Sequence, residues 1–209
     1  MKLQKLMTAT ILSTAVLFCA GAAQANIITG HLWKVAEAVT LNAVPGNVPL
    51  TTPDVTFDVN SPMNFNATNA SVGNWLATSS AFNIVENTAG TLASQMDNGT
   101  TGSILEFNGN VSVVNGQTFT VTHDDGLTLT IGGIDLGFSP APTAPITSLA
   151  TYTGPTGNFA FQLVYAECCG GPAVLQVDLP FTNVSEPATL ALLGFGLVGI
   201  GFLRRKKAA

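Results

Sequence analysis

Short runs of β-branched and apolar residues, separated by turn residues, are the feature that most restricts the fold of this chain. In TFTVTH (118–123) and LTLTI (127–131), apolar residues alternate with threonine. Alternation of this kind gives a strand one face for a core and one face for water. Segments with helical spacing are few between residues 26 and 184. The pattern predicts an all-β protein, an antiparallel β-sandwich of jelly-roll type.

Eight segments have the composition of strands. They are residues 31–41, 53–59, 82–86, 103–113, 117–123, 126–133, 158–167 and 173–181. Asp124-Asp125-Gly126 stands between two of them and is a strong signal for a tight hairpin. Residues 137–148 contain three prolines and are expected to form an extended surface loop. No repeat of fixed period is present, so we expect one domain over residues 26–184.

The first 25 residues have the form of a secretory signal peptide. Lys2 and Lys5 precede an apolar stretch, and Ala23-Gln24-Ala25 supplies the small residues of a cleavage site. The alternative is a retained membrane helix, for which the apolar stretch is short. We expect a helical signal peptide over residues 1–25 and cleavage after Ala25.

The C-terminus carries a second apolar segment that is followed by cations. Residues 188–203 are uncharged and would cover about 24 Å as a helix, less than the roughly 30 Å of a bilayer's hydrocarbon core. Such a segment can cross a membrane that is thin or locally compressed. The basic residues after it would hold this end in the cytoplasm. They are Arg204, Arg205, Lys206 and Lys207. The simplest interpretation is a C-terminal transmembrane anchor.

The whole segment SEPATLALLGFGLVGIGFLRRKK (185–207) resembles the PEP-CTERM sorting signal of Gram-negative bacteria. Glu186 and Pro187 match the Pro-Glu-Pro box of that signal, and Ser185 stands where the first Pro is usual. The resemblance implies that exosortase, a membrane-bound protease, recognises residues 185–209 and cuts near the box. It also implies export across the inner membrane, transient anchoring through the helix, and a final place at the cell surface or outside the cell. These residues are substrate features, not a catalytic site.

The charge of the body excludes one class of partner. Between residues 26 and 184, Lys34 is the one Lys or Arg, against eleven carboxylates. A surface of this sign repels phosphates, so we expect no nucleic-acid binding.

The motifs G-x-S-x-G, H-E-x-x-H and the Walker loop are all missing. His31 and His123 fall in different predicted strands, and nothing in the sequence brings them together in one site. With no catalytic motif, we expect a protein that is not an enzyme.

Residues 117–180 resemble the protective-antigen-like β-sandwich, the domain found in flocculin-type adhesins. Asp124-Asp125-Gly126 matches the first box of that pattern, and Gly157 with Phe159 the second. Tyr165 and Glu167 match the third, and Gly170-Gly171 the Gly-rich turn that follows. The resemblance implies a glycan-contacting module in which the paired Asp residues hold Ca²⁺.

Asp124 and Asp125 are therefore candidate ligands for Ca²⁺, which prefers six to eight hard oxygen donors. Two adjacent carboxylates repel each other, and a cation would relieve that repulsion. The alternative is that the stretch only builds a turn, in which Asp bonds to local backbone and Gly126 supplies a positive φ. His123 adjoins the pair, but a single His adds little to the case for a metal site.

The stretch ECCGG contains the two cysteines that remain after signal removal, Cys168 and Cys169. An exported protein enters an oxidising compartment, which disfavours free thiols. A vicinal disulfide, helped by the freedom of Gly170-Gly171, is the favoured interpretation, and it needs a distorted or cis peptide. Two thiols or intermolecular bridges are the alternatives. Adjacent sulfurs alone indicate zinc only weakly.

These features together predict a non-catalytic surface or extracellular-matrix protein that binds exopolysaccharide or another glycan, with Ca²⁺ as the only expected cofactor. The connection with exopolysaccharide comes from the PEP-CTERM resemblance. A purely structural biofilm-matrix protein without a ligand site is the second interpretation. A glycan-active enzyme is the third, because paired acids such as Asp124 and Glu167 are the residues that glycoside hydrolysis uses.

Overall fold

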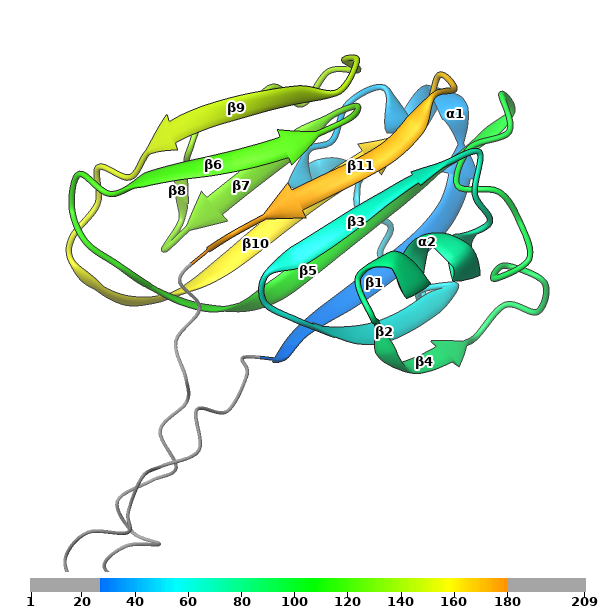
Figure 1. Cartoon of the computed structure of the whole chain (residues 1–209), viewed down its shortest axis with the longest axis horizontal. Helices are drawn as coiled ribbons and strands as arrows, with labels where there is room; N and C mark the ends of the chain where they lie inside the picture. The colour runs from blue at the N-terminus through cyan, green and yellow to red at the C-terminus, as the bar shows by residue number, and fades with distance from the viewer. Residues whose placement is uncertain (1–26, 180–209) are drawn as a thin grey trace, which may run out of the picture.

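Two antiparallel sheets packed face to face make up the computed structural model, which describes residues 27–179 (Figure 1). The larger sheet has seven strands in the order β4-β2-β1-β5-β10-β7-β8. They are β4 (Phe82–Glu86), β2 (Val55–Asn60), β1 (Ile27–Ala36), β5 (Thr101–Val113), β10 (Gly157–Glu167), β7 (Leu127–Ile131) and β8 (Ile134–Asp135). The smaller sheet has the order β3-β11-β6-β9. Its strands are β3 (Met63–Thr68), β11 (Pro172–Val177), β6 (Thr118–His123) and β9 (Ile146–Thr151). The predicted antiparallel β-sandwich is confirmed.

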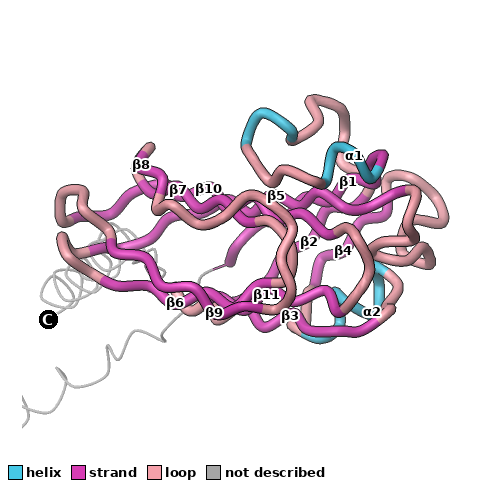
Figure 2. The backbone as a smooth tube through the Cα atoms, turned by 90° about the horizontal axis from the view of Figure 1, so that it is seen from above, coloured by secondary structure: helices cyan, strands magenta, loops and turns pink. Residues whose placement is uncertain are grey.

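The core lies between the sheets, which Figure 2 shows edge-on as two layers. Phe107 of β5 meets Phe65 of β3 across the layers, with ring centroids 5.9 Å apart. Trp75 stacks on Phe65 at 4.1 Å, and Tyr165 of β10 lies parallel to Trp75 at 6.1 Å. All four rings are fully buried. Alternation along the strands directs these side chains inward, as the sequence pattern predicts.

Three short helical segments occupy the connections between strands. They are α1 (Glu37–Thr40), η1 (Pro45–Asn47) and α2 (Val72–Thr78). The Ser71 side chain caps α2 by accepting a hydrogen bond from the backbone of Asn74. At the other end of α2, the hydroxyls of Thr78 and Ser79 accept hydrogen bonds from the edge backbone of β3. The helix thus satisfies donors that an edge strand would leave open.

Two segment boundaries expected from the sequence are wrong. The strand expected over residues 31–41 ends at Ala36, because the chain turns into α1 at Glu37. β3, β9 and α2 are additional elements that the strand pattern did not identify. The loop expected over 137–148 gives way to β9 at Ile146.

Asp124-Asp125-Gly126 does not close a hairpin. β6 before it belongs to the smaller sheet and β7 after it to the larger one. The three residues therefore form a corner that carries the chain from one sheet to the other. The hairpin prediction fails because turn chemistry reports a reversal of the chain and not the sheet in which the next strand pairs.

Residues 168–171 form a second corner, since β10 lies in the larger sheet and β11 in the smaller one. β11 begins there with Pro172 and runs to Val177 at the opposite end of the sandwich. β1 ends at Ala36 beside Thr101, on the side of the corners, so it starts from the opposite side at Ile27. Both described ends of the chain therefore leave the sandwich away from the two corners (Figure 1).

Within residues 27–179, neither α-helix has the length and apolar composition needed to cross a bilayer. The predicted signal peptide (1–25) and the predicted transmembrane helix (188–203) lie outside the described residues.

Candidate functional site

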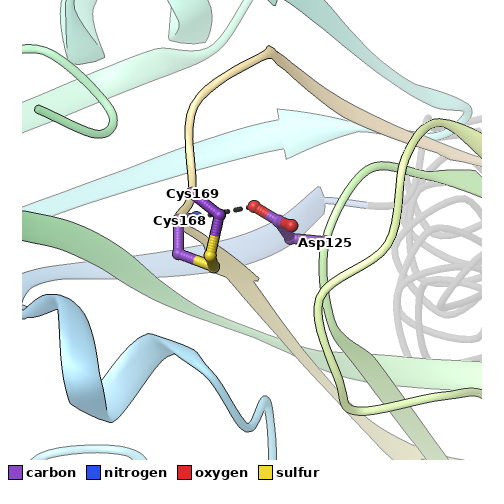
Figure 3. A group of neighbouring side chains, drawn as sticks. All are labelled: Asp125, Cys168 and Cys169. Atoms are coloured by element: carbon purple, nitrogen blue, oxygen red, sulfur yellow. Dashed lines mark hydrogen bonds between the residues drawn. A yellow bond between two sulfur atoms is a disulfide. The ribbon is translucent and has the colours of Figure 1, made fainter. Parts of the chain in front are cut away.

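The corners 124–126 and 168–171 lie side by side and are joined by hydrogen bonds. The backbone N–H of Cys168 donates to Asp125 Oδ2 at 2.7 Å (Figure 3). The Asp124 N–H donates to Val174 O at 2.9 Å, and the Ala166 N–H donates to Gly126 O at 3.0 Å. Residues forty or more positions apart in sequence thereby form one site.

Asp125 is the residue of the first corner with a left-handed backbone, at φ 63°. Turn chemistry predicts that role for Gly126, which is wrong. Gly126 is required for another reason, because a Cβ on it would lie 2.0 Å from Pro140 O. Asp is among the non-glycine residues that tolerate positive φ best, and hydrogen bonds hold Asp125 there. Its N–H donates to Asp124 Oδ1 at 3.1 Å and to Thr143 O at 3.0 Å.

Asp124 has a buried oxygen without a partner. The residue is 3 % exposed, and its Oδ1 accepts the hydrogen bond from Asp125. Its Oδ2 has no hydrogen-bond partner. A buried carboxylate oxygen with no donor is costly in its ionised form. A cation or a ligand hydroxyl that binds to this atom would therefore stabilise the site most.

The second corner is closed by a disulfide between Cys168 and Cys169. The peptide between the two residues is trans, since Ser61-Pro62 is the one cis peptide bond within residues 27–179. Their Cα atoms are 3.8 Å apart, as across any trans peptide. Cys169, Gly170 and Gly171 follow one another with φ of 64°, 73° and 111°. The Gly170 N–H donates to Asp97 Oδ2 at 3.0 Å.

A pocket of about 440 Å³ opens between the two corners and the proline-rich loop. It is lined by Asp124, Asp125, Pro142, Thr143, Ala144, Pro145, Cys169, Gly170, Gly171 and Pro172. The two carboxylates are its charged groups, Thr143 is a polar residue, and the others are apolar, cysteine or glycine. Apolar walls with a few convergent polar groups are typical of small-ligand sites.

Burial shifts the titration of the carboxylates at this end. Removal from water raises the pKa of Asp125 to about 6, against the hydrogen bond from Cys168, which lowers it. The charges of Asp124 and Asp97 raise it further. Burial also raises the pKa of Asp124. Both shifts have the sign expected where negative charge lacks a counter-cation.

Glu167 lies just behind the pocket and does not line it. It is 2 % exposed and accepts a hydrogen bond from the Tyr165 hydroxyl. Burial raises its pKa to about 9, and the charges of Asp125, Asp124 and Asp97 act in the same direction. Burial also raises the pKa of Tyr165 well above its ordinary value. Glu167 and Asp97 both line a smaller enclosed cavity of about 20 Å³ on the other side of Gly170-Gly171.

Lys34 supports this end of the molecule, and the charges of Asp97, Glu167 and Asp54 raise its pKa against the larger effect of burial. Its ammonium donates to Gln95 O at 2.7 Å, Met96 O at 2.6 Å and Ser103 Oγ at 3.1 Å. All three acceptors are uncharged oxygens, and burial lowers the pKa of Lys34 to about 8. The contacts hold the segment that leads to Asp97, whose carboxylate then meets the second corner. The one cation of the described residues is therefore structural.

The two histidines lie apart. His123 is buried, with Nδ1 2.7 Å from Asp125 O and Nε2 3.3 Å from Ser148 Oγ. Burial lowers its pKa, which favours the neutral ring, and its contact with Asp125 O positions the first corner. His31 lies on β1, with Nδ1 3.6 Å from a carboxylate oxygen of Glu106.

The donor atoms fit a hard cation better than a soft one. Asp125, Cys168 and Cys169 have their ligand-type atoms within 4.8 Å of one another. The two sulfurs are bonded to each other, so they are not the thiolates that zinc requires. The carboxylates of Asp124 and Asp125 are the oxygen ligands of Ca²⁺ chemistry. Asp124, whose Oδ2 has no hydrogen-bond partner, lines the same pocket as Asp125.

The fold is similar to that of PA14 domains of known structure. The described region superposes on the PA14 sugar-binding domain from an RTX adhesin, with a TM-score of 0.52 and 19 % identity, over 75 % of this chain and 90 % of that one. The described residues have a PA14 fold. The PA14 domain of the MpAFP antifreeze protein gives a TM-score of 0.50 and 17 % identity, over 79 % of this chain and 88 % of that one.

Residues 183–206 match the PEP-CTERM protein-sorting motif, which confirms the resemblance seen at the C-terminus. No curated protein matches the chain. The likeness to PA14 structures confirms the resemblance to the protective-antigen-like sandwich and extends it to strands before residue 117.

Within this PA14 fold, Asp124, Asp125, Cys169 and Gly170-Gly171 line the same pocket. Asp97 and residues 142–145 belong to the same end and were missed by sequence reasoning. Asp97 stands in a polar turn with no distinctive neighbours, so no local signal identifies it. The prolines of residues 142–145 indicated a loop, but only the fold places that loop against the Asp pair.

Proposed function

We propose that this chain is an exported, non-catalytic protein of the cell surface or extracellular matrix that binds a glycan in the pocket beside Asp124 and Asp125. Exopolysaccharide is the expected ligand, and Ca²⁺ the expected cofactor. The observation that carries the proposal is the buried Asp124 Oδ2, which has no hydrogen-bond partner although it belongs to a carboxylate at a 440 Å³ pocket.

Asp124 and Asp125 are the residues that would hold Ca²⁺. A bound Ca²⁺ ion supplies a positive centre to which neighbouring sugar hydroxyls can bind through their oxygens. The protein's own part is to fix the carboxylates: Cys168 and Thr143 hold Asp125, and Asp125 holds Asp124 through its N–H. The apolar pocket walls suit the C–H face of a sugar ring.

The route of the chain supports a role at a surface. The PEP-CTERM motif supports export and processing by exosortase near Ser185-Glu186-Pro187. The described chain leaves the sandwich at Leu179, at the end away from the pocket. A module held through its C-terminus would therefore present the pocket away from the membrane, toward extracellular polymer.

The deciding experiment is a glycan array with the protein purified from its own cells, in CaCl₂ and in EGTA. We expect binding to exopolysaccharide-derived glycans that EGTA abolishes and Ca²⁺ restores. Asp125→Asn should lose this binding, because it removes the charge while Asn tolerates the positive φ. Asp178→Asn is the matched control, since Asp178 is exposed just after β11 at the opposite end.

Two outcomes would replace the proposal. A folded protein that binds neither Ca²⁺ nor any glycan would favour a purely structural matrix protein. Turnover of an arrayed glycan, lost in Asp124→Asn and Glu167→Gln, would favour a glycan-active enzyme.

A further inference from the structure

The Cys168–Cys169 disulfide forms part of the pocket wall, and its backbone also contacts a carboxylate of the pocket. Cys169 is exposed and lines the pocket, whereas Cys168 is fully buried. The Cys168 N–H points at Asp125 Oδ2, 2.7 Å away and buried (Figure 3). Hydrogen bonds to a carboxylate are among the stronger ones in proteins, so this contact fixes where the Asp125 oxygens lie.

The backbone around the disulfide is one that a free cysteine would not favour. Cys169 has φ 64°, a left-handed conformation that a residue with a Cβ adopts at a cost. The bond between the sulfurs ties Cys169 to its neighbour and restricts the alternatives. The rest of the corner is two glycines with positive φ, whose free backbone allows the turn to rearrange once that restraint is removed.

We propose that the Cys168–Cys169 disulfide is a positioning element for Asp125, so that Ca²⁺ binding at the pocket depends on the redox state of this cysteine pair. The inference rests on the proposed function and names how the same site is regulated. In the oxidised chain the Cys168 N–H holds Asp125 in its place beside Asp124. In the reduced chain the corner relaxes, and Asp125 loses a fixed donor.

The redox step is an ordinary thiol–disulfide exchange with a small thiol as reductant. A thiolate attacks the exposed Cys169 sulfur, the bond between Cys168 and Cys169 breaks, and Cys168 leaves as a thiolate that takes up a proton. A second thiol then displaces the mixed disulfide, which frees the Cys169 thiol. Overall, two external thiols become one disulfide, and their two electrons and two protons end on Cys168 and Cys169.

One restraint on Asp125 lies outside the second corner. The Asp125 N–H donates to Thr143 O at 3.0 Å. Since that bond does not involve residues 168–171, we expect weaker binding rather than complete loss on reduction. Removal of one hydrogen bond to a charged group corresponds to roughly a tenfold change in affinity.

The test is calorimetric titration of the full protein with CaCl₂ alone, oxidised and after treatment with dithiothreitol, with far-UV circular dichroism on the same samples. We expect the Ca²⁺ dissociation constant to rise roughly tenfold on reduction, with the β-sheet spectrum retained. Affinity should return when the reductant is removed and oxidised glutathione is added. A purely structural disulfide would not give this reversible change in a protein that stays folded.

The Cys168→Ser/Cys169→Ser variant serves as the matched control. It should bind Ca²⁺ as weakly as the reduced chain and respond to neither dithiothreitol nor oxidised glutathione. Equal affinity in the oxidised and reduced protein would overturn the inference and leave the proposed function intact. No Ca²⁺ binding by the oxidised protein would instead overturn the calcium site itself, and this inference with it.

Discussion

Each end of the sandwich buries one side-chain oxygen atom that has no hydrogen-bond partner. The difference between the two atoms shows when such an atom indicates a ligand site and when it reflects packing alone. At the pocket end the atom is Asp124 Oδ2. At the far end it is the hydroxyl of Tyr152, which follows β9. Tyr152 is fully buried near Ile134 and Gly154, where a Cβ on Gly154 would lie 2.3 Å from the hydroxyl oxygen.

The two atoms differ in charge and in surroundings. A phenol is neutral, so burying its unpartnered hydroxyl lowers the free energy of unfolding only through the lost hydrogen bonds to water. A carboxylate must take up a proton or find a counter-cation to avoid a larger cost. Asp124 also lines a 440 Å³ pocket. An unsatisfied atom therefore indicates a ligand when it is ionisable and belongs to a residue that lines a pocket.

The largest expected effect distinguishes the corner at the pocket end from a turn at the far end. Gly126→Ala would place a Cβ 2.0 Å from Pro140 O and force the proline-rich loop away from the corner. We expect a loss of about 3 kcal/mol in the free energy of unfolding, measured by urea denaturation. Gly133→Ala is the control, since it has φ 81° but no atom within 4 Å of its Cβ position. It should cost about 1 kcal/mol, and equal costs at the two positions would remove the distinction.

Calcium linkage tests the carboxylate directly. CaCl₂ at a hundredfold excess over its dissociation constant should stabilise the wild-type protein by about 2.7 kcal/mol, seen as a higher melting temperature. Asp124→Asn should abolish this gain, because it removes the charge at the unpartnered oxygen. Tyr152→Phe should retain it in full. A gain of the same size in Asp124→Asn would mean that Ca²⁺ binds elsewhere.

The pH dependence of stability without metal tests the buried acid behind the pocket. The pKa of Glu167 is about 9 in the folded chain, above its ordinary value of 4.5, so folding takes up a proton between these values. The stabilisation from Glu167 is therefore complete below pH 4.5 and is lost as pH rises toward 9.

Glu167→Gln should make the free energy of unfolding less dependent on pH, while the amide oxygen of Gln still accepts the hydrogen bond from the Tyr165 hydroxyl. The limiting slope is about 1.4 kcal/mol per pH unit for one proton. The neighbouring carboxylates share the titration, so we expect wild type and variant to differ by about 2 kcal/mol between pH 5 and pH 8. Urea denaturation in EDTA measures it, and parallel profiles for the two proteins would contradict it.

The smallest expected effect belongs to the far end. Tyr152→Phe removes a buried hydroxyl that has no partner, so we expect a change in the free energy of unfolding within about 1 kcal/mol, in favour of the variant. Urea denaturation measures the change. A loss of several kcal/mol would show that the Tyr152 hydroxyl has a partner, and the comparison of the two ends would then fail.

Sequence reasoning reached the fold class and part of the site because both depend on local chemistry. Alternation along β6 reports which side chains face the core. In the first half of β5 and at the start of β7, successive residues are buried, so alternation there indicates a strand but not a face exposed to water. The pair Asp124 and Asp125 and the pair Cys168 and Cys169 were visible because their residue types are scarce in this chain, which has twelve Asp and Glu residues and three Cys residues. The match to the sorting motif over residues 183–206 is likewise a local pattern.

Other features could not be predicted from the sequence because they depend on contacts between distant residues. Whether Asp124-Asp125-Gly126 makes a hairpin or a corner is decided by the strand that accepts the hydrogen bonds of β7, and that strand is β10. The positive φ falls on Asp125 because Thr143 and Cys168 hold it there, and Gly126 is needed because Pro140 approaches.

The sequence by itself determined the alternating strands, the acidic body, the sorting motif at the C-terminus and the residue types available for a site. Only the tertiary structure decided that two corners meet, that Asp97 and the proline-rich loop join them, and that Asp124 Oδ2 is left without a partner. The physical reason is that propensity and pattern act over a few residues. Burial and hydrogen bonding at the pocket end are set by segments far apart in the chain, such as Asp97 and Gly170, which are 73 positions apart.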